Sequence, residues 1–207
     1  MDYSNFGDIM YPNSLEKLID SFKYLPGIGE KTAERLAFAV LDMDEEIVEQ
    51  FSISLNNVKE TIHKCPICNS LTDLEKCSIC ENKNRDNEVL CVVEDPKSVF
   101  LFEKLGLFKG KYHVLNGLIS PLDGINPEDI ELEKLIDRIK KNNYKEIILA
   151  FKPSIEGETT SLYIKRILGD MNLSITKIAS GIPIGADMEY IDAMTLERAL
   201  IDRKNVE

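Results

Sequence analysis

The chain has 207 residues, of which 43% are hydrophobic and 29% are charged, and its formal net charge is −11. This length and apolar content allow one sizeable core or two small ones. The sequence has no run of about 18 apolar residues, so we expect no transmembrane helix. The first residues include Asp2 and Asp8 and show no basic start before an apolar segment, so we expect no secretion signal and a cytoplasmic location.

The acidic net charge excludes a protein that coats nucleic acid through a broadly basic surface. If DNA is a ligand, its contacts must be few in each subunit or multiplied by oligomerisation. One short zone does gather basic residues, namely Lys23, Lys31 and Arg35. The acidic remainder suits docking to basic protein partners, and a solvated, solubilising surface explains it equally well.

The N-terminal part of the sequence predicts a small helical domain over residues 1–60. Apolar residues recur at helical spacing over 14–25, where Asn13 or Ser14 is the expected N-cap. The Leu-Pro-Gly-Ile-Gly segment at 25–29 then ends this helix. Two further apolar stripes of helical spacing follow.

The glycine turn between the first two predicted helices favours binding of a phosphate backbone. Glycine permits torsion angles closed to other residues, and the amides at the start of a helix attract phosphate oxygens. Lys31 and Arg35 lie four residues apart and project from one side of the second helix. This pattern is the helix-hairpin-helix signature, which binds DNA without reading its sequence. The alternative is a glycine turn in a hairpin used for dimerisation.

The sequence also contains two CxxC pairs that predict a structural zinc site within residues 61–84. The predicted ligands are Cys65, Cys68, Cys77 and Cys80. Four thiolates complete a tetrahedral shell and leave no position for an activated water, so the metal would be structural rather than catalytic. The alternatives are a redox dithiol or a cluster site, but a redox CxxC usually lies beside a βαβ pattern. We interpret Cys91 as a small buried hydrophobic residue.

After residue 85 the pattern changes to that of an α/β domain. The continuous apolar run at 89–93 is typical of a buried parallel strand. Further strands are expected at 112–115, 146–151 and 174–179, alternating with helices at 96–105, 126–141 and 158–168. This alternation predicts a mostly parallel sheet over residues 85–178. Asn126 is the expected cap of its helix, and residues 179–207 form a glycine- and proline-rich loop followed by a helix.

Acidic residues follow two of the predicted strands. Glu94 comes after the first, and Glu156 and Glu158 come after the third. Ligand sites in parallel sheets lie beyond the carboxyl ends of the strands, and Mg²⁺ prefers carboxylate ligands. The arrangement resembles the Toprim domain, whose acids serve Mg²⁺-dependent phosphoryl transfer, so Mg²⁺ is a candidate second cofactor. Alternatively, Glu156 and Glu158 are acids favoured at a helix N-terminus.

Taken together, these segments resemble the RecR family of bacterial recombination mediators. The resemblance is carried by LPGIGEKTAERLAF at 25–38, CPICNSLTDLEKCSIC at 65–80, LCVVED at 90–95, YHVLNGLISPLDGINPEDI at 112–130, EGETTSLYI at 156–164 and IASGIPIGADMEYIDAMTLERAL at 178–200. The order and spacing of these segments are far more specific than any single motif.

The resemblance implies an α+β multidomain fold. Its parts are a helix-hairpin-helix domain at 1–60, a four-cysteine zinc finger at 61–84, a Toprim domain at 85–178 and a subunit-swapped segment at 179–207. It further implies a tetrameric ring that encircles DNA. Members of the family work with RecO and RecF to load RecA onto gapped single-stranded DNA, and they are not known as enzymes.

By position, the resemblance assigns DNA contact to Lys31 and Arg35 and zinc binding to the four cysteines. It assigns an acidic, partner-docking patch to Glu94, Glu156 and Glu158. The chain departs from the usual pattern at Asn116, Lys152 and Ala186. A residue other than glycine is disfavoured at 116 or 186 if those positions need a positive φ, although asparagine tolerates it best.

Three functional hypotheses follow. The leading one is a non-enzymatic, clamp-like DNA-binding scaffold in recombinational repair. The second is a Mg²⁺-dependent Toprim nuclease or relaxase, for which the sequence indicates no nucleophile. The third is a zinc-dependent protein adaptor that does not bind DNA.

Overall fold

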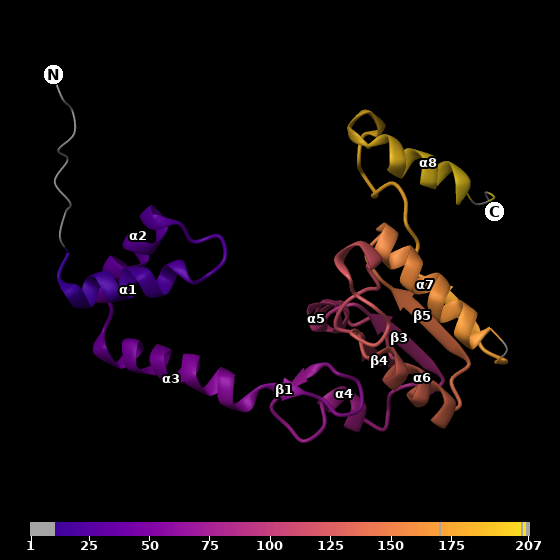
Figure 1. Cartoon of the computed structure of the whole chain (residues 1–207), viewed down its shortest axis with the longest axis horizontal. Coiled ribbons are helices and arrows are strands. Elements are labelled where there is room, and N and C mark those ends of the chain that lie inside the picture. Colours follow the sequence, from indigo (N-terminus) through magenta and orange to yellow (C-terminus); the bar gives the residue numbers. More distant parts are fainter. Residues whose placement is uncertain (1–10, 170, 204, 206–207) are drawn as a thin grey trace. The chain divides into compact units, whose positions relative to one another are not determined.

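The computed structural model of the chain describes residues 11–169, 171–203 and 205. Residues 1–10, where we expect no secretion signal, lie outside the described part. The chain divides into two compact units, Met1–Thr61 and Ile62–Glu207, and Figure 1 shows the elements of each. Among the described residues, no helix has the length and apolar character needed to cross a membrane.

From residue 11 on, the first unit contains three helices, α1 (Asn13–Lys23), α2 (Glu30–Leu41) and α3 (Glu45–Thr61). Its small core joins Leu15 and Ile19 of α1 to Ala33 and Ala37 of α2. The two alanines lie one turn apart on α2, and their small side chains let the helices approach closely. The expected caps of α1 are wrong, because Pro12 occupies the N-cap position and its carbonyl accepts the first helical N–H bonds.

Helix α3 differs from its neighbours because the described residues leave its apolar side chains uncovered. None of its residues is buried. Its exposed hydrophobic residues at helical spacing are Ile47, Phe51, Leu55 and Val58, each about half exposed. A helix in a protein gains most of its stability from packing an apolar face. The stripe on α3 therefore needs a partner surface.

The second unit is built around a parallel sheet with strand order β4-β3-β5-β6. The strands are β3 (Val89–Val93), β4 (Lys111–Val114), β5 (Glu146–Ala150) and β6 (Ser174–Lys177). Their connecting helices are α5 (Pro96–Leu105), α6 (Leu132–Lys141) and α7 (Ile155–Leu168). Helices α6 and α7 contribute to the larger core on one face, while α5 packs with Cys91 on the other. The predicted α/β domain with its parallel sheet is confirmed, as is the burial of Cys91.

The remaining elements are short. The finger contains the antiparallel pair β1 (His63–Lys64) and β2 (Leu71–Thr72), followed by α4 (Ser78–Glu81). Two 3-10 turns, η1 (Pro121–Asp123) and η2 (Met188–Tyr190), lie in loops, and α8 (Ala193–Ile201) is the last helix of the described part.

Two predicted helix starts are wrong. Residue 126 does not cap a helix: its N–H donates to the Asp129 carboxylate over 2.8 Å, and α6 begins at Leu132. Glu131, with a φ of 54°, stands in the left-handed region and separates the preceding turns from the helix. Helix α7 begins at Ile155, because the Ser154 side chain caps it by accepting the Gly157 N–H.

His113 is a fully buried histidine at the centre of β4. Its Nδ1 lies 3.3 Å from a guanidinium nitrogen of Arg138, and its Nε2 has no hydrogen-bond partner among the described residues. Burial, aided by the charges of Arg138 and Lys134, lowers the pKa of His113 to about 3. The imidazole is therefore neutral in the folded protein at neutral pH.

This burial predicts a loss of stability in acid. The unfolded chain takes up a proton at His113 near its ordinary pKa of about 6.5. The folded chain resists protonation down to about pH 3. Stability is thus retained above about pH 6.5 and falls as the pH drops toward 3. From about pH 7.5 to about pH 5, the free energy of unfolding should fall by about 2 kcal/mol through this group.

Urea unfolding at the two pH values, with wild type and His113→Gln compared, measures this contribution. The loss between the two pH values should be smaller in the variant. Acid-sensitive groups elsewhere act on both proteins and cancel in the comparison. Equal losses in the two proteins would contradict the assignment.

Candidate metal centre and nucleic-acid interface

The four cysteines of the two CxxC pairs form one compact cluster. The sulfur atoms of Cys65, Cys68, Cys77 and Cys80 all lie within 4.8 Å of one another. A tetrahedral zinc ion with Zn–S bonds of about 2.3 Å holds its sulfurs roughly 3.8 Å apart. The cluster therefore has the size and the donor atoms of a four-thiolate zinc site.

The backbone around the cluster favours negatively charged sulfurs. The Cys77 N–H donates to Cys65 Sγ and the Cys80 N–H donates to Cys77 Sγ, each over 3.4 Å. A hydrogen bond between the Cys68 and Cys77 side chains, 3.5 Å apart, lowers the pKa of Cys77 and raises that of Cys68. Zinc would replace the proton held there, since it binds the thiolate. Bound zinc would supply only a structural crosslink, because protein sulfurs fill the whole shell.

The first knuckle of the finger is attached to the outer edge of β4. The Val114 N–H donates to the Cys68 carbonyl over 2.8 Å. Asn69, which has a φ of 61°, donates from Nδ2 to the Val114 carbonyl and to Glu131, both over 3.1 Å. Its Oδ1 accepts from Lys134. These bonds satisfy backbone groups that an edge strand would otherwise leave open to pairing.

The second knuckle is held by Lys111, a lysine of β4 that is only 6% exposed. Its Nζ donates to the carbonyls of Ile79, Cys80 and Asn82 at 2.8, 3.1 and 2.8 Å. Burial lowers the pKa of Lys111, and the charges of Arg85 and Arg138 act in the same direction, while the charges of Cys80 and Cys77 act against it.

Arg85 adds a third attachment where the chain leaves the finger. Its guanidinium binds both oxygens of Glu103 on α5, at 2.9 and 2.7 Å, and donates to the Gly110 carbonyl at 2.9 Å. Two-point arginine–carboxylate pairs fix geometry as well as charge. The finger is therefore fastened to the α/β domain at its start, its middle and its end.

The glycine turn of the first unit presents the predicted DNA-binding residues to solvent. Gly27 has a φ of 81°, a conformation that favours glycine, and Gly29 is the N-cap of α2. Lys31 and Arg35 are both exposed on α2. Lys23 is different, because its ammonium contacts the carboxylates of Asp20 and Glu30 at 2.8 and 3.0 Å. The basic charge available beside the turn thus comes from Lys31 and Arg35.

The predicted acidic residues are only partly brought together. A cleft of about 560 Å³ beyond the strand ends is lined by Glu94, Asp95, Asn116, Ser120, Asp123, Lys152 and Glu156, among others. Glu158 does not line it and instead pairs with Lys177 of β6 at 2.9 Å. Sequence reasoning did not place Ser120 and Asp123 at this cleft. Both residues lie in the loop that follows the second strand of the parallel sheet. Because ligand sites form beyond the carboxyl ends of such strands, this loop could have been predicted to line the cleft.

Local bonds shape the acidic cleft. The Lys152 N–H donates to Glu94 Oε2 over 3.3 Å. A hydrogen bond from the Ser154 side chain, aided by the charge of Lys152, lowers the pKa of Glu156. A Cβ on Gly157 would lie 2.3 Å from the Lys152 carbonyl oxygen, so only glycine allows α7 to start this close to the strand end.

The departures from the family pattern have different consequences. Asn116 has a φ of 60°, in the left-handed region that asparagine tolerates best among residues with a Cβ. Ala186 does not need such a conformation, because the positive φ falls on the preceding residue, Gly185. Lys152 introduces a positive charge into the cleft.

Zinc removal should destabilise the second unit. A structural metal present at about 1,000 times its Kd contributes roughly 4 kcal/mol to folding. Its removal by a chelator should lower the Tm by about 10 °C, the shift such an energy produces in a chain of this size. Cys65→Ser should lose the metal and melt early, whereas Cys91→Ala should retain one zinc per chain. Unchanged melting after verified zinc loss would sink this prediction.

Comparison with known proteins agrees with this architecture. Family models match for the RecR helix-hairpin-helix at residues 15–59, the RecR four-cysteine zinc finger domain at 62–82, the Toprim domain at 88–179 and the RecR C-terminal segment at 181–204. The fold class predicted from the sequence, including its zinc finger and Toprim domain, is confirmed. The clustered cysteines and the match to the zinc finger family together support a structural zinc ion.

Three relatives match nearly the whole chain. Recombination protein RecR of Staphylococcus haemolyticus is 50% identical over 193 residues, which cover 93% of this chain and 98% of the relative. The RecR proteins of Staphylococcus saprophyticus and Staphylococcus aureus are 50% and 49% identical over the same lengths and shares. The chain therefore belongs to the RecR family of recombination proteins.

Proposed function

We propose that the protein is a non-enzymatic DNA-binding scaffold in cytoplasmic recombinational repair. It closes around DNA as a homo-oligomeric ring, works with RecO-like and RecF-like partners, and helps to load RecA onto gapped single-stranded DNA. In this proposal the chain has four domains, a helix-hairpin-helix domain at 1–60, a zinc finger at 61–84, a Toprim domain at 85–178 and a subunit-swapped segment at 179–207. The observation that carries the proposal is the exposed cation pair beside the glycine turn of α2.

This cation pair suits backbone recognition rather than sequence reading. The start of α2 bears partial positive charge, and the left-handed turn at Gly27 lets the main chain approach a phosphate. Lys31 and Arg35 then add charges on the same helix. Contacts of this kind fix position on DNA without specifying bases. Binding should accordingly be independent of sequence and sensitive to salt.

Replacing Lys31 and Arg35 with alanine should weaken DNA binding. If each residue neutralises one phosphate, the slope of log K against log salt should fall by about 2 for each subunit engaged on DNA. Fluorescence anisotropy at low salt, with duplex and gapped DNA, measures both affinity and slope. Lys23→Ala is the matched control, because Lys23 is already paired with Asp20 and Glu30. Unchanged affinity in the double variant would refute the role of this pair.

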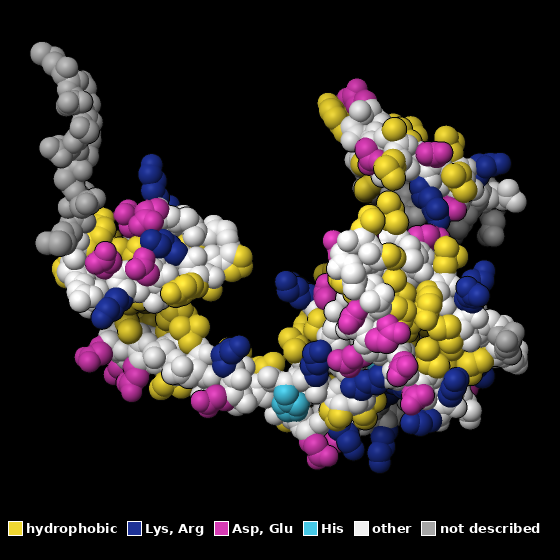
Figure 2. Space-filling view, viewed as in Figure 1, with side chains coloured by type: hydrophobic (Ala, Val, Ile, Leu, Met, Phe, Trp, Pro, Cys, Tyr) yellow, Lys and Arg dark blue, Asp and Glu magenta, His cyan; other side chains and the backbone are white. Residues whose placement is uncertain are grey.

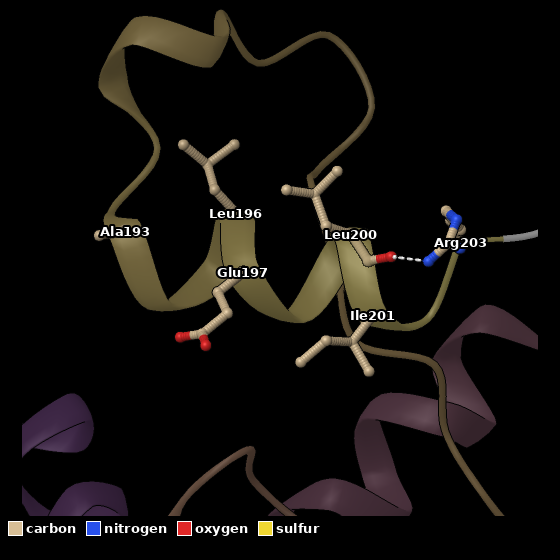
Figure 3. Close-up of a pocket in the computed structure, with 6 residues that line it drawn as sticks. All are labelled: Ala193, Leu196, Glu197, Leu200, Ile201 and Arg203. Atoms are coloured by element: carbon tan, nitrogen blue, oxygen red, sulfur yellow. Dashed lines mark hydrogen bonds between the residues drawn. The ribbon is translucent and has the colours of Figure 1, made fainter.

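Exposed apolar surfaces support the homo-oligomer. Besides the stripe on α3, a second apolar surface lies in the last segment, where Figure 2 shows hydrophobic side chains exposed on α8. Met194, Leu200 and Ile201 are between 63% and 79% exposed. Figure 3 shows Leu196, Leu200 and Ile201 around a shallow pocket on this helix. Exposed apolar patches of this kind mark interaction sites.

A second copy of the chain is the occupant we propose for both surfaces. Two different self-contacting surfaces, one on α3 and one on α8, can join copies into a closed ring. A ring also resolves the charge problem, because one cation pair per subunit becomes several acting on the same DNA.

Sedimentation of the purified protein tests the ring. Wild type should form an oligomer larger than a dimer, and Phe51→Glu on α3 or Leu200→Glu on α8 should each reduce it to a smaller species. DNA affinity should fall in parallel. Leu122→Glu, at a residue that is 99% exposed on η1, is the matched control. A wild-type chain that stays monomeric at every workable concentration, alone and on DNA, would overturn the proposal.

The acidic cleft is proposed as a docking site for basic segments of the partner proteins. Glu94 and Glu156 present their carboxylates there, whereas Glu158, on the same helix as Glu156, is paired with Lys177 and lies at the margin of the proposed patch. The competing function is a Mg²⁺-dependent Toprim nuclease or relaxase. Cleavage of supercoiled or single-stranded DNA in Mg²⁺, lost in Glu94→Ala, would favour that enzyme over the scaffold.

A further inference from the structure

The finger and the Toprim sheet meet at β4, and this junction includes a buried lysine, Lys111. We propose that Lys111 is a positioning residue of the zinc site. Its ammonium, supplied by the Toprim edge strand, holds the turn that carries Cys77 and Cys80, so zinc retention depends on the sheet as well as on the four sulfurs. This inference rests on the structural zinc and not on the proposed DNA function.

The contacts of Lys111 converge on the end of one short helical turn. Cys77 caps α4 and Cys80 lies within it, so this turn sets the position of two ligands. The helix has only four residues, and the carbonyls at a helix end lack partners within the helix. Lys111 Nζ binds three of these carbonyls, those of Ile79, Cys80 and Asn82. A lysine at this end also opposes the negative end of the helix dipole.

The hydrogen bonding at Lys111 is complete. An ammonium group has three N–H donors, and three carbonyls accept them at 2.8 to 3.1 Å. Burial of an ammonium is unfavourable unless its donors are satisfied, so this set of bonds resists separation of the two elements. Its loss would remove the Lys111 donor from the half-buried Ile79 and Cys80 carbonyls and would free the turn.

The charge of Lys111 also fits the metal centre. Four thiolates and one Zn²⁺ ion carry a net charge of about −2. The Lys111 ammonium contacts the carbonyl of Cys80, one of the four ligands, in a largely water-excluded position. A nearby cation therefore stabilises the fully deprotonated, metal-bound form. Groups that orient metal ligands in this way typically change metal affinity by about 10- to 100-fold when they are replaced.

The other half of the ligand set is anchored to the same strand. Cys68 accepts the Val114 N–H through its carbonyl, and Asn69 donates to the Val114 carbonyl. Lys111 and Val114 are the two ends of β4. One strand thus contacts both knuckles, one at each of its ends. The finger is accordingly not a self-contained zinc module.

Zinc release from the full-length protein tests the role of Lys111. A chromogenic chelator is added in excess, and the rate of zinc transfer is measured in wild type, Lys111→Met, Lys111→Arg and Lys109→Met. Release should be about 10- to 100-fold faster in Lys111→Met. Lys111→Arg, which keeps the charge and donors, should recover part of the loss. Lys109→Met, at an exposed lysine two residues earlier, should behave as wild type.

A second control separates zinc positioning from general destabilisation. Tyr112→Phe removes the bond from the Tyr112 hydroxyl to Glu103, on the α5 face of the same strand, and leaves the three Lys111 bonds and the Arg85–Glu103 pair in place. This variant should lose thermal stability but release zinc at the wild-type rate. Cobalt-substituted protein gives a further readout, because its thiolate-to-metal absorption should shift in Lys111→Met only.

Two results count against the proposal. Wild-type zinc release in Lys111→Met, or equal acceleration in Tyr112→Phe, would overturn it. If Lys111→Met does not fold, Lys111→Gln replaces it, with a smaller acceleration expected because its amide can still donate. The zinc-release test does not measure DNA binding. Its outcome is therefore independent of whether the proposed DNA-binding function is correct.

Discussion

The structure of the second unit depends on how the outer edge of β4 is closed. A parallel sheet of four strands has two edges, and an open edge invites pairing with other chains. Here the zinc knuckle covers one edge, with Val114 bound to Cys68 and Asn69, and Lys111 bound to the end of α4. The 61–84 segment has little apolar material of its own, so the metal and this edge together hold it in place.

The chain that leaves β4 at this junction forms part of the acidic cleft. Leu115 follows β4 and donates its N–H to the Val93 carbonyl, and Asn116 then turns into the cleft through its left-handed backbone. The buried Thr160 of α7 links the loop after β4 to the start of α7, since its hydroxyl accepts the Ile119 N–H and donates to the Glu156 carbonyl. The cleft walls thus depend on residues that the zinc finger, β4 and α7 hold in register. Hydrogen bonds thus hold the surface that we propose for partner docking, and ordering a binding surface in advance lowers the entropic cost of binding.

Some of this architecture could be predicted because its signals are local. Two CxxC pairs predict a zinc site whatever the surrounding fold, since each pair places two sulfurs on one turn. The Gly27 turn with Lys31 and Arg35 is equally local, and the apolar run at 89–93 indicates a buried strand by its composition alone. The errors came from signals that tertiary contacts override. Pro127 favours a helix start, yet Glu131 adopts a left-handed conformation where it also meets Asn69 and Lys64 from the finger.

The residues alone specify the class of each part: a helical hairpin with a glycine turn, a four-thiolate metal site, a parallel α/β sheet and acids beyond its strand ends. Which of these residues act together depends on the folded arrangement. Folding placed Glu94 and Glu156 in one cleft with Lys152, paired Glu158 with Lys177, neutralised Lys23, and buried Lys111 against the finger. The two kinds of information differ because the forces behind them differ in range. Torsional preference and apolar periodicity act over a few residues, whereas a charge or hydrogen bond acts on whatever group the fold brings within a few ångströms.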